Sequence, residues 1–121
     1  MNNLSKDIVT VCKMKLIDLR TELLDQLAQQ RKEHMERDVG RDDIDASQEV
    51  LAEHQFLTTN TRIRKQIIEI DHALGRIERG IFGVCEETEE PIEASRLMAI
   101  PWTRVSLEGA ELREERSKRF A

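Results

Sequence analysis

Two long stretches without helix-breaking residues, separated by a short acidic loop, constrain the fold of this chain most strongly. Residues 5–38 contain no Gly or Pro, and residues 47–79 contain one Gly and no Pro. The loop at 41–47 reads RDDIDAS. Two long helices joined by a short loop pack antiparallel. We therefore expect a helical hairpin, with arms of about 50 Å at ~1.5 Å per residue, that carries a carboxylate cluster at its tip.

Apolar residues follow helical spacing in both stretches. The first arm has a stripe at Val9, Leu16, Leu19, Leu23 and Leu27. The second arm has a seam at Ile63, Ile67, Ile70, Leu74 and Ile77. The steps of four and three residues in the second seam are typical of a coiled coil. Ser5 is a candidate N-cap for the first helix and Gly40 a candidate stop, while Asp42, Asp45 or Ser47 could cap the second.

Composition limits the size and the class of the protein. The 121 residues allow one domain, or a hairpin with a small head, and 36% charged with 3% aromatic residues favours long helices with thin seams. The net charge of -5 argues against duplex nucleic acid as the main partner, so we expect no sequence-specific DNA binding. No apolar run approaches the ~18 residues that span a bilayer. With two cysteines and no apparent signal peptide, we expect a cytoplasmic monomer with reduced thiols and no membrane association.

The sequence after the second arm predicts a small head and a last helix. Arg79 followed by Gly80 ends the hairpin, which we place at residues 1–79 with its tip at 41–47. Residues 82–85 and Ile92 read as two short strands around an acidic turn. We place the head at 80–103 and a charged C-terminal helix at 104–121.

Three segments of this region carry a resemblance to a known family. They read ALGRIERGIFGVCE at 73–86, EPI at 90–92 and RLMAIP at 96–101. Over residues 42 to 113 the chain resembles the DksA/TraR family of bacterial proteins that bind RNA polymerase. The resemblance implies a mainly α fold, with a long antiparallel coiled-coil hairpin, a small zinc-finger-like globular head and a C-terminal helix.

The resemblance extends to the tip and implies a function. The family carries D-x-x-D-x-A there; Asp42 and Asp45 fall on the aspartates and Ser47 on the alanine. It implies a transcription regulator of the stringent-response type, not an enzyme, whose hairpin enters the secondary channel of RNA polymerase. Its tip would then change the stability of promoter complexes. Two alternatives stay open: a transcript-cleavage factor of the Gre type, and a hairpin adaptor without a polymerase role.

A basic group on the second arm has two interpretations. The group consists of Arg62, Arg64 and Lys65. It could contact an acidic surface on the polymerase, or it could form a solvated face with intrahelical ion pairs.

The four zinc positions of the family are largely lost. They read Cys85, Thr88, Ser106 and Gly109 in this chain. Structural zinc needs four N or S ligands in a tetrahedron, so we predict a metal-free head without any other cofactor. Cys85 is then expected to be a small buried apolar residue, and His72 to be solvated. The apolar residues that we expect to replace the metal are Ile81, Phe82, Val84, Ile92, Leu97, Met98, Ile100, Trp102 and Val105.

The nucleotide site of the ppGpp-responsive members is also changed. Where those members carry basic residues, this chain has Glu69 and Ile100. Because a polyphosphate needs Arg or Lys partners, the resemblance implies that ppGpp is not bound by this chain.

Overall fold

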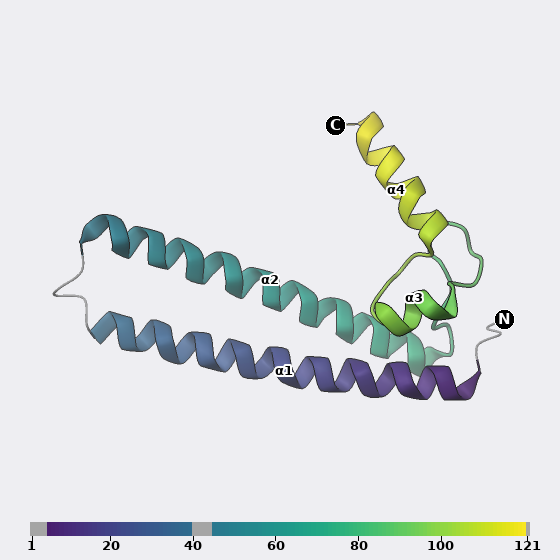
Figure 1. Ribbon diagram of the computed structural model, residues 1–121, viewed down its shortest axis with the longest axis horizontal. Coiled ribbons are helices and arrows are strands. Elements are labelled where there is room, and N and C mark those ends of the chain that lie inside the picture. The colour runs from purple at the N-terminus through teal and green to yellow at the C-terminus, as the bar shows by residue number, and fades with distance from the viewer. Residues whose placement is uncertain (1–4, 40–44, 121) are drawn as a thin grey trace. The chain divides into compact units, whose positions relative to one another are not determined.

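The computed structural model describes residues 5–39 and 45–120, and four helices lie in these ranges. Their bounds are α1 Lys6–Val39, α2 Ala46–Arg79, α3 Ala94–Ala99 and α4 Leu107–Arg119 (Figure 1). The expected mainly α fold with a hairpin and a C-terminal helix is confirmed. In the described ranges, no helix is both long and apolar enough to cross a bilayer.

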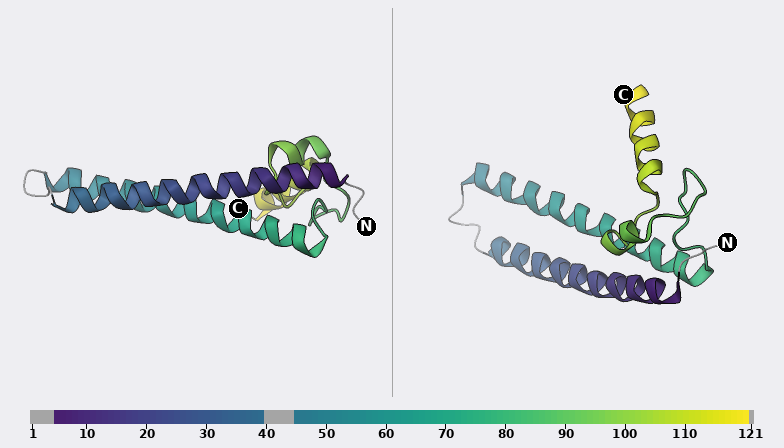
Figure 2. Two further views of the ribbon diagram at one scale, coloured as in Figure 1. Left: turned by 90° about the horizontal axis from the view of Figure 1, so that it is seen from below. Right: turned by 45° about the vertical axis from the view of Figure 1, so that its right-hand side comes forward.

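The contacts of the chain divide it into two compact units. Unit 1 comprises residues 1–18 and 69–121, and unit 2 comprises residues 19–68. Each unit contains one segment of α1 and one of α2, which run side by side in opposite directions (Figures 1 and 2). The domain boundaries expected after residues 79 and 103 stay a prediction.

Local hydrogen bonds explain where α1 and α2 begin. The Ser5 hydroxyl accepts a hydrogen bond from the Ile8 amide at 3.2 Å, so Ser5 is the N-cap of α1 as predicted. Asp45 caps α2, because its Oδ1 accepts from the Ser47 amide at 3.3 Å. The candidate helix stop Gly40 and the candidate cap Asp42 lie outside the described residues.

The predicted apolar stripes supply most of the buried side chains of the two arms. In unit 2, Leu23, Ile63 and Ile67 are buried, and in unit 1 the buried apolar side chains of the arms are Cys12, Leu16, Ile70 and Ala73. Between residues 24 and 62, the described part of the chain has no fully buried apolar side chain. The arms are therefore held together most firmly near their junction with the head.

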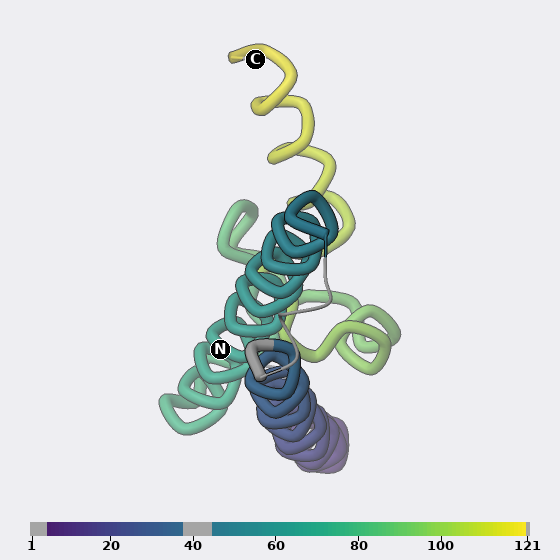
Figure 3. Tube along the Cα trace, turned by 90° about the vertical axis from the view of Figure 1, so that its left-hand side faces the viewer, coloured from purple at the N-terminus to yellow at the C-terminus, as the bar shows by residue number. Residues whose placement is uncertain are grey.

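The head contains irregular connections around α3 (Figures 2 and 3). The prediction of two strands is wrong: the described residues there form a single antiparallel bridge between Val84 and Pro91. The turn is closed by the Cys85 amide donating to the Glu90 carbonyl at 2.9 Å. Because α3 begins at Ala94, the chain leaves the pairing too soon for a ladder to extend.

Ile81 is the one head residue whose expected burial is clearly wrong, since its side chain is 49% exposed. The cause lies in the end of α2, where Gly80 has a φ of 74°. The Gly80 amide donates to the Ile77 carbonyl at 3.2 Å, and the Ile81 amide donates to the Arg76 carbonyl at 3.0 Å. This is a Schellman motif, and it leaves Ile81 at the surface.

The remaining core of the head is apolar, as expected. Its buried members are Phe82, Cys85, Ile92, Leu97 and Val105.

The first turns of α1 close the end of α3, because Lys15 Nζ donates to the Met98 carbonyl at 2.9 Å and Cys12 Sγ donates to the Leu97 carbonyl at 3.5 Å. These bonds satisfy carbonyls that a helix end leaves unpaired.

Candidate functional site

The described part of the tip is organised around Asp45 and Ser47. Asp45 is exposed, and both of its carboxylate oxygens accept hydrogen bonds from Ser47. The amide donates to Oδ1, and the hydroxyl donates to Oδ2 at 3.0 Å. An alanine at position 47 could make only the first bond. Ser47 therefore orients the carboxylate of Asp45, while Asp42 lies outside the described residues.

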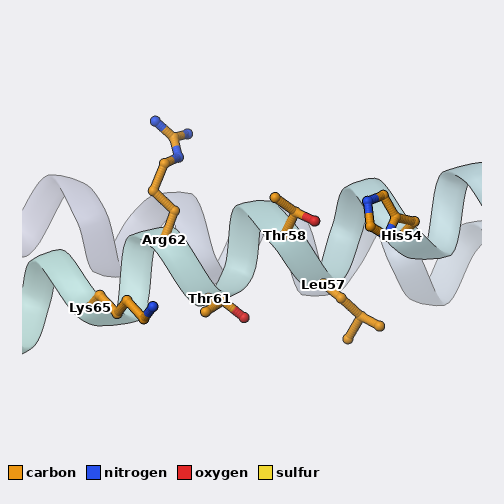
Figure 4. A pocket seen from close by; sticks show the side chains of 6 residues that line it. All are labelled: His54, Leu57, Thr58, Thr61, Arg62 and Lys65. Atoms are coloured by element: carbon orange, nitrogen blue, oxygen red, sulfur yellow. The ribbon is translucent and has the colours of Figure 1, made fainter. Parts of the chain in front are cut away.

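Two of the three candidate basic residues share a face of α2. Arg62 and Lys65 line a shallow hollow of about 540 Å³ in unit 2. The other lining residues are His54, Leu57, Thr58 and Thr61. All six belong to α2, and in Figure 4 they lie in front of the helix with α1 behind it. We call these six residues the outer face. Arg62 extends to one edge of it and Leu57 to the other (Figure 4).

The third basic residue, Arg64, lies elsewhere. Its Nε donates to Asn60 Oδ1 at 2.6 Å. Arg64 lines a groove between α1 and α2 in unit 2, together with Leu24, Leu27, Ala28, Arg31, Phe56 and Asn60. The structure thus divides the basic group of the sequence between two surfaces.

The four degenerate zinc positions come together in the head. Ser106 connects Cys85 and Gly109, since its hydroxyl donates to Cys85 Sγ at 3.4 Å and accepts from the Gly109 amide at 3.0 Å. The second bond makes Ser106 the N-cap of α4. Thr88 also forms a hydrogen bond with Cys85. A Cβ on Gly109 would lie 2.5 Å from Cys85 Sγ, so the thiol occupies the space that a side chain at 109 would need.

This cluster does not fit a structural zinc ion. It offers one thiol, the hydroxyls of Thr88 and Ser106, and a glycine, whereas structural zinc takes four N or S ligands. In residues 5–39 and 45–120, no group of three His, Cys, Asp or Glu side chains could hold a metal ion. The metal-free head stays a prediction.

Cys85 is buried, but it is more than an apolar filler. Burial raises the pKa of its thiol, yet hydrogen bonds from the side chains and amides of Ser106 and Thr88 outweigh burial and lower the pKa to about 6. The thiol is 1% exposed. The sequence did not predict this role, because Thr88 and Ser106 were interpreted only as zinc ligands that had been lost.

We predict that Cys85 makes the stability of the protein depend on pH. An unfolded thiol titrates near ~8.5, so between about pH 6 and 8.5 the folded state binds fewer protons than the unfolded state. The stabilisation is complete above that range and is lost as the pH falls to 6. Urea unfolding across the range should give a free energy of unfolding that rises with pH, and Cys85→Ser should flatten the rise.

Cys12→Ser is the matched control for that experiment. Burial raises the pKa of the Cys12 thiol, although the charge of Lys15 lowers it in part. Its removal should therefore leave the rise between pH 6 and 8.5 in place. The same slope in Cys85→Ser as in the wild type would contradict the assignment.

An ion-pair network, which sequence reasoning missed, joins α2, the head and α4 within unit 1. Arg104 donates to both Glu69 oxygens, at 2.7 and 3.2 Å, and to Glu86 at 3.0 Å. Arg104 also lies within hydrogen-bonding reach of the exposed His72. The hydrogen bond from Arg104 is the main cause that lowers the pKa of Glu69. No periodicity marks this pairing, because it joins residues on separate elements.

The same network continues to the C-terminal helix. Arg113 donates to Glu87 at 2.6 Å and to Glu86 at 3.0 Å, and Arg116 donates to Glu87 at 2.7 Å. Glu86 and Glu87 of the acidic turn therefore anchor α4 in unit 1. The spacing of Arg113 and Arg116, one helical turn apart, was the available signal.

Comparison with known proteins shows to which family this arrangement belongs. Residues 80–115 match the family described as prokaryotic dksA/traR C4-type zinc finger. The structure is similar to that of transcription factor DksA2 from Pseudomonas aeruginosa, with a TM-score of 0.78 and 30% identity over 94% of this chain and 88% of that chain. The chain belongs to the DksA/TraR family. The resemblance stated from the sequence is confirmed.

Two further relatives align with different fractions of this DksA/TraR family chain. An uncharacterized protein of Aquifex aeolicus (strain VF5) is 32% identical over 94% of this chain and 81% of its own length. An RNA polymerase-binding transcription factor DksA of Caulobacter vibrioides is 48% identical, but over 51% of this chain and 44% of that protein. The Caulobacter protein and DksA2 are both named as transcription factors, in agreement with the expectation that this chain is not an enzyme.

Proposed function

We propose that this protein binds bacterial RNA polymerase and regulates transcription. The observation that carries the proposal is the similarity to DksA2, which extends over 94% of the chain. The test is binding to purified RNA polymerase, combined with transcription in vitro from an rRNA promoter. Cleavage of backtracked RNA should be measured in the same reactions. A chain that binds and shortens the RNA would be a cleavage factor instead, and a chain that does not bind would be an adaptor for another partner.

In this proposal the hairpin enters the secondary channel and brings Asp42 and Asp45 near the active centre. The exposed, oriented carboxylate of Asp45 supports this role. Charge placed there shifts the equilibrium between promoter complexes if it interacts more favourably with one state than with another. Regulation then needs no chemistry from the chain itself.

The outer face supplies a polymerase contact in the same proposal. Arg62 and Lys65 share the outer face with Leu57, which is 54% exposed. A surface of this kind fits an acidic partner surface that also offers an apolar contact. Arg64 would not take part in this contact, because it lines the other groove.

We predict that the head folds without zinc. One thiol among four ligand positions cannot hold the ion, and Ser106 already joins Cys85 to the start of α4. Elemental analysis of the purified protein should give well under one zinc per chain, and a chelator should leave the melting temperature unchanged. One equivalent of zinc whose removal unfolds the protein would contradict this prediction.

We also predict that the protein acts without ppGpp. Glu69 stands where ppGpp-responsive relatives carry a basic residue, and it is paired with Arg104. Ile100, at the other basic position of the nucleotide site, carries no charge. Loss of two charge-assisted contacts, each worth roughly 1.5–3 kcal/mol, weakens a composite site by about two orders of magnitude or more. Transcription with a polymerase that lacks its own ppGpp site should show no synergy, and clear synergy there would overturn the prediction.

A further inference from the structure

A groove between α1 and α2 in unit 2 has no role in the function proposed so far. We call it the hairpin groove. It has a volume of about 440 Å³ and is lined by Leu24, Leu27, Ala28, Arg31, Phe56, Asn60 and Arg64. Four of its seven lining residues are apolar, and Arg31 belongs to α1 and Arg64 to α2. Ala28 is exposed and has the smallest side chain of the seven.

One wall of the hairpin groove is held in place by other contacts. The Phe56 ring stacks on His34 with centroids 4.0 Å apart and an angle of 7° between the planes. His34 Nδ1 lies 3.6 Å from Glu53 Oε2. Arg64 is oriented by its bond to Asn60. The groove is thus formed before any partner arrives, which lowers the entropic cost of binding.

The charge of the hairpin groove differs from that of the chain. Its two charged lining residues are both arginines, although the protein has 24 acidic against 19 basic residues. No carboxylate lines this groove or the hollow of the outer face. Two guanidinium groups beside exposed apolar surface favour an acidic partner that also supplies an apolar side chain.

The spacing of the lining residues favours a helix as that partner. On α1, Leu24 and Ala28 are four residues apart, and on α2, Phe56, Asn60 and Arg64 follow the same step. Rows of this kind on two antiparallel helices form the holes into which a side chain of a third helix inserts. Acidic residues one turn from that side chain would then reach the arginines.

We propose that the hairpin groove docks an acidic helix of RNA polymerase, with one large apolar side chain seated against Ala28 and carboxylates paired with Arg31 and Arg64. This inference rests on the proposed function. It gives the hairpin a further polymerase contact, separate from the outer face and from the tip. The groove sets affinity and orientation, whereas the tip alone changes transcription.

The first test is binding of the full chain to purified RNA polymerase holoenzyme at about 0.1 M salt. Arg31→Glu with Arg64→Glu should weaken the Kd about tenfold, which corresponds to about 1.4 kcal/mol. The control Lys32→Glu makes the charge change of one of these two substitutions, at an exposed position of α1 that lies outside the groove, and should change the Kd less than twofold. Melting curves establish that the variants are folded.

The second test identifies the occupant without changing the charges. A photo-crosslinking amino acid at Ala28 should react with a polymerase segment that is helical and acidic, and the same group at Lys32 should not. A lysine in place of the crosslinked acidic residue should restore binding to Arg31→Glu.

The outcomes separate this inference from the proposed function. Absence of wild-type binding to the polymerase would overturn both. Normal wild-type binding with an unchanged Kd for the double reversal, or a crosslink to a segment without carboxylates, would overturn the groove alone.

Discussion

Asp42→Asn combined with Asp45→Asn should abolish the effect of this protein on transcription while most of its affinity for RNA polymerase remains. The substitutions remove two charges with almost no change in shape. Asn caps helices as well as Asp does, so α2 should still begin at Ala46. Substitutions at exposed positions usually cost within about 0.5 kcal/mol of stability. Promoter-complex lifetimes and rRNA-promoter transcription, measured beside the Kd, check this expectation.

Two further variants sharpen this experiment. Asp18→Asn removes a carboxylate from an exposed position of α1 far from the tip in sequence, and should regulate as the wild type does. Ser47→Ala removes the hydroxyl that donates to Asp45 Oδ2 and so tests the orientation of the carboxylate without changing charge. If the double tip variant regulates promoters as well as the wild type, the carboxylates do not carry the activity.

The helices of the hairpin were predictable because local rules and packing agree there. Ser5 acts as the predicted cap, and Ile63, Ile67 and Ile70 face the other arm. Apolar residues spaced by three and four positions lie on one face of a helix, so their burial determines which face of α2 packs. The position of Gly80 also predicted the end of α2, because its left-handed φ suits glycine.

The candidate sites were predictable only in part, because they depend on contacts between distant residues. Sequence placed Arg62, Arg64 and Lys65 in one group, but their angular positions around α2 send Arg64 to the other surface. No sequence pattern marks Arg104, yet it pairs with Glu69, 35 residues away.

The head illustrates a different limit of sequence reasoning. A missing ligand in a zinc finger reads as a loss, but Ser106 replaces the metal link with hydrogen bonds to Cys85 and to the start of α4. Hydrogen-bonded hydroxyls have no fixed spacing pattern, unlike the ligand set of a structural zinc site. The sequence therefore predicted the absence of the ligand set but not the arrangement that takes its place.

Gly109→Ala should destabilise the protein by about 1–2 kcal/mol, although alanine favours helices. A Cβ at this position would meet Cys85 Sγ at 2.5 Å and Val105 Cβ at 3.1 Å. Cys85 is fully buried and has a short side chain, so it cannot turn away. Overpacking typically costs about 1–3 kcal/mol, against up to ~1 kcal/mol gained in helix propensity. Urea unfolding at fixed pH measures the difference.

Gly75→Ala is the matched control, because it makes the same change where the Cβ would meet nothing within 4 Å. Within α2, four residues before its end at Arg79, it should stabilise the protein by about 0.5–1 kcal/mol, so the two substitutions are expected to have opposite signs. Adding Cys85→Ala removes the sulfur atom, and the cost of Gly109→Ala should then shrink or vanish. Such a coupling belongs to residues in direct contact. Additive effects of the two substitutions would mean that the thiol does not fill the place of the missing side chain.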